Sequence, residues 1–186
     1  MKSFFPTALL GIPLFLLVPS VTQCGAQDQL KQDVVDAFKI FENLDNAVAM
    51  LDVDLDGDLD CLVAKRTEFD KNGPSATYVW ILSGLNGEEK NNITFHLKPG
   101  PSPDKPAFTL GNGGGPEQIA NFVFADYQSC AVIQLPYGGG QECMLWVTNE
   151  TKDNYPQYCV DQYEDNCGGQ KIAYDENTCS QLLGSS

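Results

Sequence analysis

Residues 130–148 carry the clearest structural signal in the chain and read CAVIQLPYGGGQECMLWVT. Two β-like runs, 130–136 and 143–148, flank the glycines at 138–140. A glycine-rich break between two apolar runs is typical of a turn between strands. The stretch therefore predicts two strands that each begin with a cysteine.

Runs of the same kind precede this stretch. Asp56-Gly57 and Pro99-Gly100-Pro101 are among the turn signals that separate them. The predicted upstream strands cover residues 46–53, 61–67, 76–84, 92–98, 106–110 and 119–125. Eight short strands with turns between them favour an all-β fold, either a sandwich or an up-and-down barrel.

Two of these strands are apolar on both faces, namely Thr77–Leu82 and Asn121–Phe124. Such strands are either covered on both sides or line an apolar cavity. An eight-stranded barrel has an interior just large enough for one small ligand. An ordinary filled core is the alternative, and composition alone favours it.

Helical patterns lie on either side of the strands. In residues 33–41, Val34, Phe38 and Phe41 fall on one helical face. The segment from Pro156 to Asp165 begins with proline and is followed by glycines, as expected for a short helix.

The first 26 residues predict an export signal. Lys2 precedes an apolar run over 8–18, and Cys24-Gly25-Ala26 offers small residues at a cleavage site. An N-terminal membrane anchor is the alternative, but the run is shorter than the roughly 20 residues that spanning needs. Cleavage leaves residues 27–186, which suit a single domain and a secreted, extracellular location.

The same cleavage removes one of the seven cysteines. An even number of cysteines in an exported chain predicts three disulfides, although spacing alone leaves fifteen pairings open. The six that remain are Cys61, Cys130, Cys143, Cys159, Cys167 and Cys179.

Charge and composition exclude several functions. The formal net charge is −14, which disfavours nucleic acid and anionic membranes as partners. His96 is the single histidine, and no serine or cysteine nucleophile is paired with it in a recognisable pattern. We therefore expect a monomeric binding protein with no enzymatic activity and no cofactor.

An acidic segment runs from Asp52 to Asp60 as DVDLDGDLD. It satisfies a D-x-D-x-D-G-x-x-D calcium loop but lacks the glutamate that completes an EF-hand. A hairpin turn with solvated acids is the alternative. We assign no metal site and leave calcium binding by Asp52, Asp54, Asp56 and Asp60 open.

Two glycosylation sequons are present, at Asn92 and Asn149. Both asparagines lie at a predicted strand end, so both are accessible in the predicted fold. They are consistent with passage through a secretory pathway.

Several short motifs resemble the tick salivary lipocalins, the family that includes the histamine-binding proteins. The motifs are Asp36-Ala37-Phe38, the approach from Phe124 to Cys130, and Cys143-Met144-Leu145-Trp146, with Cys159 and Cys179 downstream. Their order and spacing resemble the family over residues 33 to 179.

The resemblance implies an eight-stranded up-and-down lipocalin barrel with an N-terminal helix and a C-terminal helix packed outside. It also implies the disulfides Cys61–Cys179 and Cys130–Cys159. These two leave Cys143 and Cys167 for the third.

The chain departs from the family at two positions. Amine-binding members resemble one another in carrying acids where this chain has Ala131 and Met144. A buried ammonium needs a carboxylate partner, so these replacements favour an apolar lipid such as an eicosanoid, fatty acid or sterol. The expected ligand-binding residues are Phe38, Tyr78, Trp80, Phe95, Phe122, Phe124, Ala131, Ile133, Met144 and Trp146.

A lipid that carries a carboxylate would need a cation near the barrel mouth. Lys65, Arg66 and Lys98 are the candidates, although solvated strand ends explain them equally well.

The predicted function is therefore capture of a small host mediator in tick saliva as a means of evading host defence. Two alternatives stay open: a lipocalin scaffold that inhibits a host protein such as a complement component, and an amine binder for histamine or serotonin with unusual acids.

Overall fold

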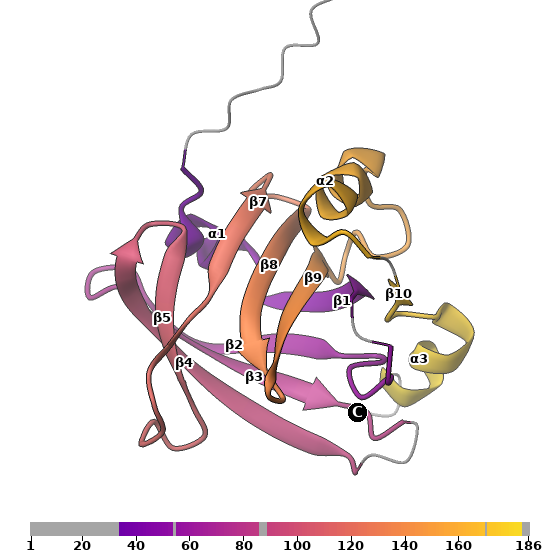
Figure 1. Cartoon of the computed structure of the whole chain (residues 1–186), viewed down its shortest axis with the longest axis horizontal. Helices are drawn as coiled ribbons and strands as arrows, with labels where there is room; N and C mark the ends of the chain where they lie inside the picture. The colour runs from indigo at the N-terminus through magenta and orange to yellow at the C-terminus, as the bar shows by residue number, and fades with distance from the viewer. Residues whose placement is uncertain (1–33, 54, 86–88, 170, 184–186) are drawn as a thin grey trace, which may run out of the picture. The chain divides into compact units, whose positions relative to one another are not determined.

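The computed structural model describes residues 34–53, 55–85, 89–169 and 171–183 (Figure 1). The predicted signal peptide lies outside them. The helices are α1 (Ala37–Asn43), α2 (Gln157–Cys167) and α3 (Glu176–Leu183). The strands are β1 (Asn46–Asp52), β2 (Val63–Asp70), β3 (Ser75–Leu82), β4 (Asn91–Ser102), β5 (Lys105–Leu110), β6 (Gln118–Ile119), β7 (Asn121–Ala125), β8 (Cys130–Tyr137), β9 (Gly140–Thr148) and β10 (Lys171–Ile172).

The strands form one antiparallel sheet in the order β6-β5-β4-β3-β2-β1-β9-β8-β7, and β10 pairs with β1. The strands at the two ends of this order, β6 and β7, are consecutive in the sequence and are separated only by Ala120. The Ala120 and Phe122 N–H groups donate to the Pro106 and Asp104 carbonyls, at 3.1 and 2.8 Å. If β6 and β7 are counted as one interrupted strand, the predicted eight-stranded up-and-down barrel is confirmed.

Alternation along β3 separates the two faces of the barrel wall. Ala76, Tyr78, Trp80 and Leu82 are buried in an inner cluster, while the residues between them are half-buried on the outside. β1 and β9 are buried on both faces. Their outer face belongs to a second cluster that includes Tyr163 of α2 and Tyr174, which follows β10.

The N-terminal helix begins later than predicted. The Asp36 carboxylate caps α1 by accepting hydrogen bonds from the Phe38 and Lys39 N–H groups. Val34 therefore precedes the helix and is 66% exposed, so its predicted place on the helical face was wrong. Phe41 is buried as predicted, together with Ile40.

The C-terminal part contains one helix that was predicted and two elements that were not. α2 extends two residues beyond the predicted end and stops at Gly168, whose left-handed φ of 71° suits glycine. β10 and α3 had no clear periodic signal and were missed. No helix among the described residues combines the length and apolar character needed to cross a membrane.

Three disulfides join the C-terminal segment to the barrel. They are Cys61–Cys179, Cys130–Cys159 and Cys143–Cys167, the pairs expected from the family resemblance. Two of them attach α2 to the first residue of β8 and to β9, and α2 lies beside these strands in Figure 1.

Candidate functional site

A cavity of about 70 Å³ lies inside the barrel, next to α1. Its wall carries no charged side chain and is almost wholly apolar. The lining residues are Ile40, Phe41, Leu44, Ala47, Ala64, Tyr78, Trp80, Phe95, Leu97, Phe108, Ala120, Phe122, Ile133, Leu135 and Trp146.

Trp80 is the centre of an aromatic group in this wall. Its ring centroid lies 4.4 Å from that of Phe95, 5.3 Å from that of Tyr137 and 5.5 Å from that of Trp146. Tilted aromatic pairs at these separations are favourable beyond the apolar area that they bury. The wall is thus a packed aromatic surface with a small space in it.

Six of the ten expected ligand-binding residues line this cavity. They are Tyr78, Trp80, Phe95, Phe122, Ile133 and Trp146. Ala131 and Met144 belong to the same inner cluster and are fully buried, behind the immediate wall. Phe38 lies in a separate, open groove at the barrel mouth with Phe69 and Tyr127.

Phe124 lies outside the barrel, where its ring meets that of Tyr158 with the centroids 6.3 Å apart. Strict alternation places Phe122 and Phe124 on one face, but the β7–β8 register shifts between these two residues. Such a bulge turns the following side chain to the other face. The expectation that Phe124 faces the cavity was therefore wrong.

The sequence reasoning missed the contribution of α1 to the wall. Ile40, Phe41 and the C-cap residue Leu44 all face the cavity. No local pattern in the sequence predicts that a helix folds over the mouth of a barrel. Strand alternation could have found Leu97 and Phe108, which pair across β4 and β5.

Polar groups lie at the α1 end of the cavity. The Tyr78 hydroxyl donates to the Leu44 carbonyl, and Arg66 Nη1 donates to the Phe41 carbonyl. Burial is the largest influence on the pKa of Tyr78 and raises it far above its usual value, while the Arg66 guanidinium acts in the opposite direction. The Tyr78 hydroxyl is therefore neutral and able to donate.

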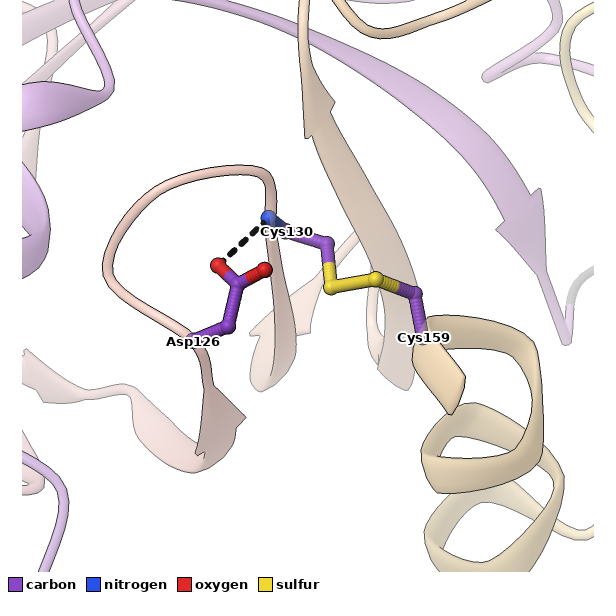
Figure 2. Close-up of side chains that lie close together, drawn as sticks. All are labelled: Asp126, Cys130 and Cys159. Atoms are coloured by element: carbon purple, nitrogen blue, oxygen red, sulfur yellow. Dashed lines mark hydrogen bonds between the residues drawn. A yellow bond between two sulfur atoms is a disulfide. The ribbon is translucent and has the colours of Figure 1, made fainter. Parts of the chain in front are cut away.

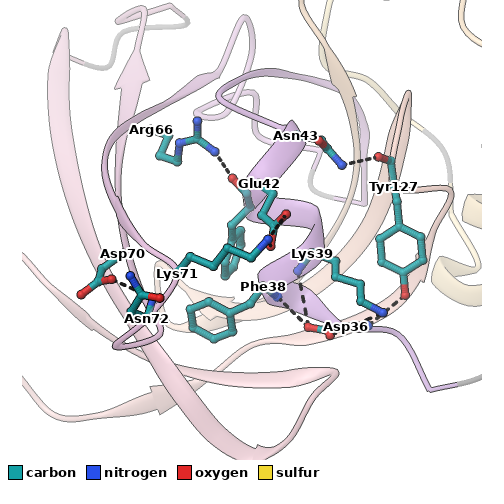
Figure 3. A network of polar contacts seen from close by, with 11 residues as sticks. Asp36, Phe38, Lys39, Glu42, Asn43, Arg66, Asp70, Lys71, Asn72 and Tyr127 are labelled. Carbon is teal, nitrogen blue, oxygen red and sulfur yellow. Dashed lines mark hydrogen bonds and ion pairs between the residues drawn. The ribbon is translucent and has the colours of Figure 1, made fainter.

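Polar contacts hold α1 across the mouth (Figure 3). The Asp36 N–H donates to the Tyr127 hydroxyl at 3.0 Å, and Asn43 Nδ2 donates to the Tyr127 carbonyl at 2.9 Å. Lys71 Nζ forms an ion pair with the Glu42 carboxylate at 3.0 Å. These contacts tie both ends of α1 to the loops around it.

The other two candidate cations lie away from the cavity. Lys65 is exposed on β2, and its neighbours Ala64 and Arg66 point inward by alternation. Lys98 is exposed and pairs with Glu117. Of the three, Arg66 alone approaches the site.

One group of residues has the arrangement of metal ligands, but it is not a metal site. Asp126, Cys130 and Cys159 place their ligand atoms within 4.8 Å of one another. Figure 2 shows that the two sulfurs form a disulfide, so neither is available as a thiolate. The Asp126 carboxylate instead accepts from the Gln128, Ser129 and Cys130 N–H groups and from the Tyr158 hydroxyl.

These contacts determine the ionisation of Asp126. Burial is the largest single influence and opposes ionisation. The hydrogen bonds from Cys130, Tyr158, Gln128 and Ser129 together outweigh it and lower the pKa below its usual value.

The acidic segment forms the connection between β1 and β2. Asp52 ends β1 and is buried, and the Asp60 carboxylate forms an ion pair with Lys171 at 3.0 Å. The Asp56 carboxylate accepts from the Asp58 N–H at 3.0 Å. Asp54 lies outside the described residues.

The two sequons and His96 lie on β4 and directly after β9. Asn92 and Asn149, in the two sequons, are exposed. His96 is half-buried on β4, and Nε2 lies 2.9 Å from the Gly111 carbonyl oxygen.

A family model described as tick histamine binding protein matches residues 28–181. A comparison with curated protein sequences finds no match.

Solved structures share the fold. The serotonin complex of AM182 is 18% identical, covers 77% of this chain and 92% of its own, and has a TM-score of 0.56. Japanin from Rhipicephalus appendiculatus, bound to cholesterol, is 12% identical, with coverage of 73% and 95% and a TM-score of 0.52. The tryptamine complex of the amine binding protein of Rhodnius prolixus is 14% identical, with coverage of 83% and 94% and a TM-score of 0.51.

Proposed function

The chain belongs to the tick histamine-binding protein family, and from that premise we propose that it is a secreted lipocalin that sequesters a small apolar lipid inside its barrel. The observation that supports a lipid is the composition of the cavity wall, in which every residue is aliphatic or aromatic. The three disulfides support secretion, because such bridges persist in oxidising compartments.

The absence of an acid from the wall argues against an ammonium ligand. Ala131 lies opposite Trp146, and Met144 lies opposite Ile133, so the two positions that resemble the acids of amine binders are apolar here. Both side chains are fully buried. A desolvated ammonium with no carboxylate partner costs several kcal/mol.

The size of the cavity constrains how a ligand is held. Typical ligand sites occupy roughly 300–1,000 Å³, and this cavity has about 70 Å³. A lipid chain must therefore displace wall side chains. Those contributed by α1 are the best placed to move, because no disulfide ties α1 to the barrel.

An amine ligand is the second candidate, and the structural neighbours favour it. Two of them are complexes with serotonin and tryptamine, whereas another is bound to cholesterol. The shared fold thus accommodates both classes.

Intrinsic fluorescence gives a direct test, because the chain has two tryptophans, and both Trp80 and Trp146 line the cavity. We expect quenching or a spectral shift on titration with dodecanoic acid or cholesterol, and none with histamine; serotonin is itself a fluorescent indole, so its binding is tested by mass instead. Native mass spectrometry of the same mixtures gives the stoichiometry, which we expect to be one ligand per chain.

A matched pair of variants locates the binding. Phe95→Ala removes a ring from the wall, while Phe124→Ala removes one from the outer surface. We expect only Phe95→Ala to change lipid affinity. Tight amine binding without lipid binding would reject the lipid proposal.

We also propose that the sequons at Asn92 and Asn149 are glycosylated, since both asparagines are exposed. Expression in a eukaryotic secretory host should give a product whose mass falls on treatment with an N-glycosidase. Asn92→Gln and Asn149→Gln should each remove one glycan, and a product of unchanged mass would refute the proposal.

A further inference from the structure

Arg66 points into the barrel at the α1 end of the cavity. Ala64 and Arg66 lie two residues apart on β2 and therefore share a face. Their partners across β3 are Trp80 and Tyr78, and Ala64, Trp80 and Tyr78 all line the cavity. Arg66 is the next inward side chain towards the mouth.

The guanidinium has aromatic and neutral polar neighbours. It donates to the Phe41 carbonyl, lies within hydrogen-bonding reach of the Tyr78 hydroxyl, and stands 5.2 Å above the centroid of the Phe69 ring. The ion pairs found in the described part of the chain all involve lysines and do not include Arg66.

The nearest acids are used elsewhere or face solvent. Glu42 pairs with Lys71 and Asp36 caps α1. Asp45 is exposed, and its backbone carbonyl, rather than its carboxylate, accepts from the Arg66 N–H. Arg66 is half-buried and forms no ion pair with a carboxylate of the described residues, although the exposed Asp45 carboxylate acts on the neighbouring Tyr78.

A guanidinium has five N–H donors, and the contacts above use only part of them. Arg66 does not itself line the cavity, but its β3 partner Tyr78 and its hydrogen-bond acceptor Phe41 both do. A carboxylate beside the guanidinium would take two hydrogen bonds from one charged partner, the geometry in which arginine binds carboxylates best.

We infer that Arg66, held in place by the Phe41 carbonyl and the Tyr78 hydroxyl, binds the carboxylate of a monocarboxylic lipid whose chain occupies the apolar cavity. The inference rests on the proposed function and narrows it from lipids in general to carboxylic acids. The acid head lies at the α1 end, and the chain runs towards Trp80 and Trp146. An ammonium head in the same place meets a like charge.

Four probes with the same twelve-carbon chain test this on the full-length mature protein: dodecanoic acid, dodecan-1-ol, methyl dodecanoate and dodecylamine. We expect the acid to bind at least about tenfold more tightly than the alcohol or the ester, because only the acid offers the guanidinium a charged acceptor. Dodecylamine should bind most weakly.

Arg66→Gln and Lys65→Gln provide matched variants, because each removes one positive charge from adjacent positions on β2 and only Arg66 faces inward. Arg66→Gln should weaken acid binding at least about tenfold and leave alcohol binding within about twofold. Lys65→Gln should bind all four probes as the wild type does. Arg66→Lys, which keeps the charge, should retain part of the preference for the acid over the alcohol. Tyr78→Phe should reduce that preference by a smaller factor than Arg66→Gln does.

The outcomes separate this inference from the proposed function. Equal affinity of the wild type for acid, alcohol and ester would overturn the carboxylate site while leaving lipid binding intact. Failure of every probe to bind would reject the proposed function itself. If Arg66→Gln does not fold, as a thermal melt would show, the wild-type comparison of the acid, alcohol and ester decides alone.

Discussion

The helices α1 and α2 both pack on the barrel, but they are attached in different ways. α2 carries Cys159 and Cys167, which tie it to β8 and β9 through two disulfides. α1 has no cysteine and is held by noncovalent contacts alone: the buried Ile40 and Phe41 side chains, and polar contacts with Tyr127, Lys71 and Arg66. Yet α1 lines the cavity and α2 does not.

The way in which each helix is attached indicates how far it can move. The covalent links hold α2 on the outer face of β8 and β9, whose inner faces supply Ile133, Leu135 and Trp146 to the cavity wall. The α1 side is held by hydrogen bonds of about 1 kcal/mol each and by burial of Ile40 and Phe41, about 1.5–3 kcal/mol per side chain. We infer that the barrel is rigid along β8 and β9 and can yield at α1. Four predictions test the comparison.

Removal of one α2 link should have the largest effect. Cys130→Ser with Cys159→Ser opens a bridge between residues 29 apart in sequence, and we expect a loss of about 3–4 kcal/mol in the free energy of unfolding. Urea denaturation measures it. The matched pair Cys143→Ser with Cys167→Ser, 24 residues apart, should cost a similar amount. A loss below about 1 kcal/mol in both would mean that noncovalent packing already holds α2.

Native-state hydrogen exchange compares the two helices directly. We expect the Leu44 amide, which donates to the Ile40 carbonyl at the end of α1, to exchange about 100-fold faster than the amides around the buried Tyr163 in α2. Dodecanoic acid should change protection in α1 far more than in α2. Equal protection in the two helices would contradict the idea that α1 is the yielding wall.

Loss of one α1 contact should have a smaller effect. Tyr127→Phe removes the hydroxyl that accepts from the Asp36 N–H, and we expect a loss of about 1 kcal/mol in the free energy of unfolding. The control is Tyr158→Phe, which removes a hydroxyl from α2 instead. Only Tyr127→Phe should increase exchange of the α1 amides, and an increase in both variants would show that the two sites are not independent.

Acidification should have the smallest effect and act on the α2 side. The Asp126 pKa is lowered in the folded state, so ionised Asp126 stabilises the fold at pH values above its unfolded pKa of about 3.9. That stability is lost as the pH falls from there through the lower folded pKa. Urea denaturation measures the free energy of unfolding of the wild type and of Asp126→Asn. The amount by which the wild-type value exceeds that of the variant should shrink below about pH 4. A constant difference between pH 6 and pH 3 would contradict the lowered pKa.

Local patterns in the sequence were enough to predict the barrel strands. Most strands alternate or are apolar over five or more residues and stop at a glycine, proline or aspartate turn, and both signals are local. Two boundaries were wrong: β4 continues through Pro99-Gly100-Pro101 to Ser102, and β9 begins at Gly140 and not at Cys143. β10 and α3 are short and carry neither signal. The family resemblance supplied the disulfide pairing, which spacing alone leaves open.

The cavity depended on long-range packing. Alternation placed Tyr78, Trp80 and Phe95 inside, because side-chain direction along a regular strand follows from the backbone. It failed at Phe124, since a bulge depends on how β7 meets β8. It also could not show that Ile40, Phe41 and Leu44 close the cavity from 30 or more residues away in sequence from Tyr78.

The sequence by itself determined the strands, the number of bridging cysteines and the apolar character of the barrel interior, because each is a property of neighbouring residues. Only the tertiary structure decided how large the cavity is, which helix closes it and which cation faces it. Lys65 and Arg66 are equivalent as sequence signals, and the closure of the barrel around Tyr78 is what directs one of them towards the ligand site.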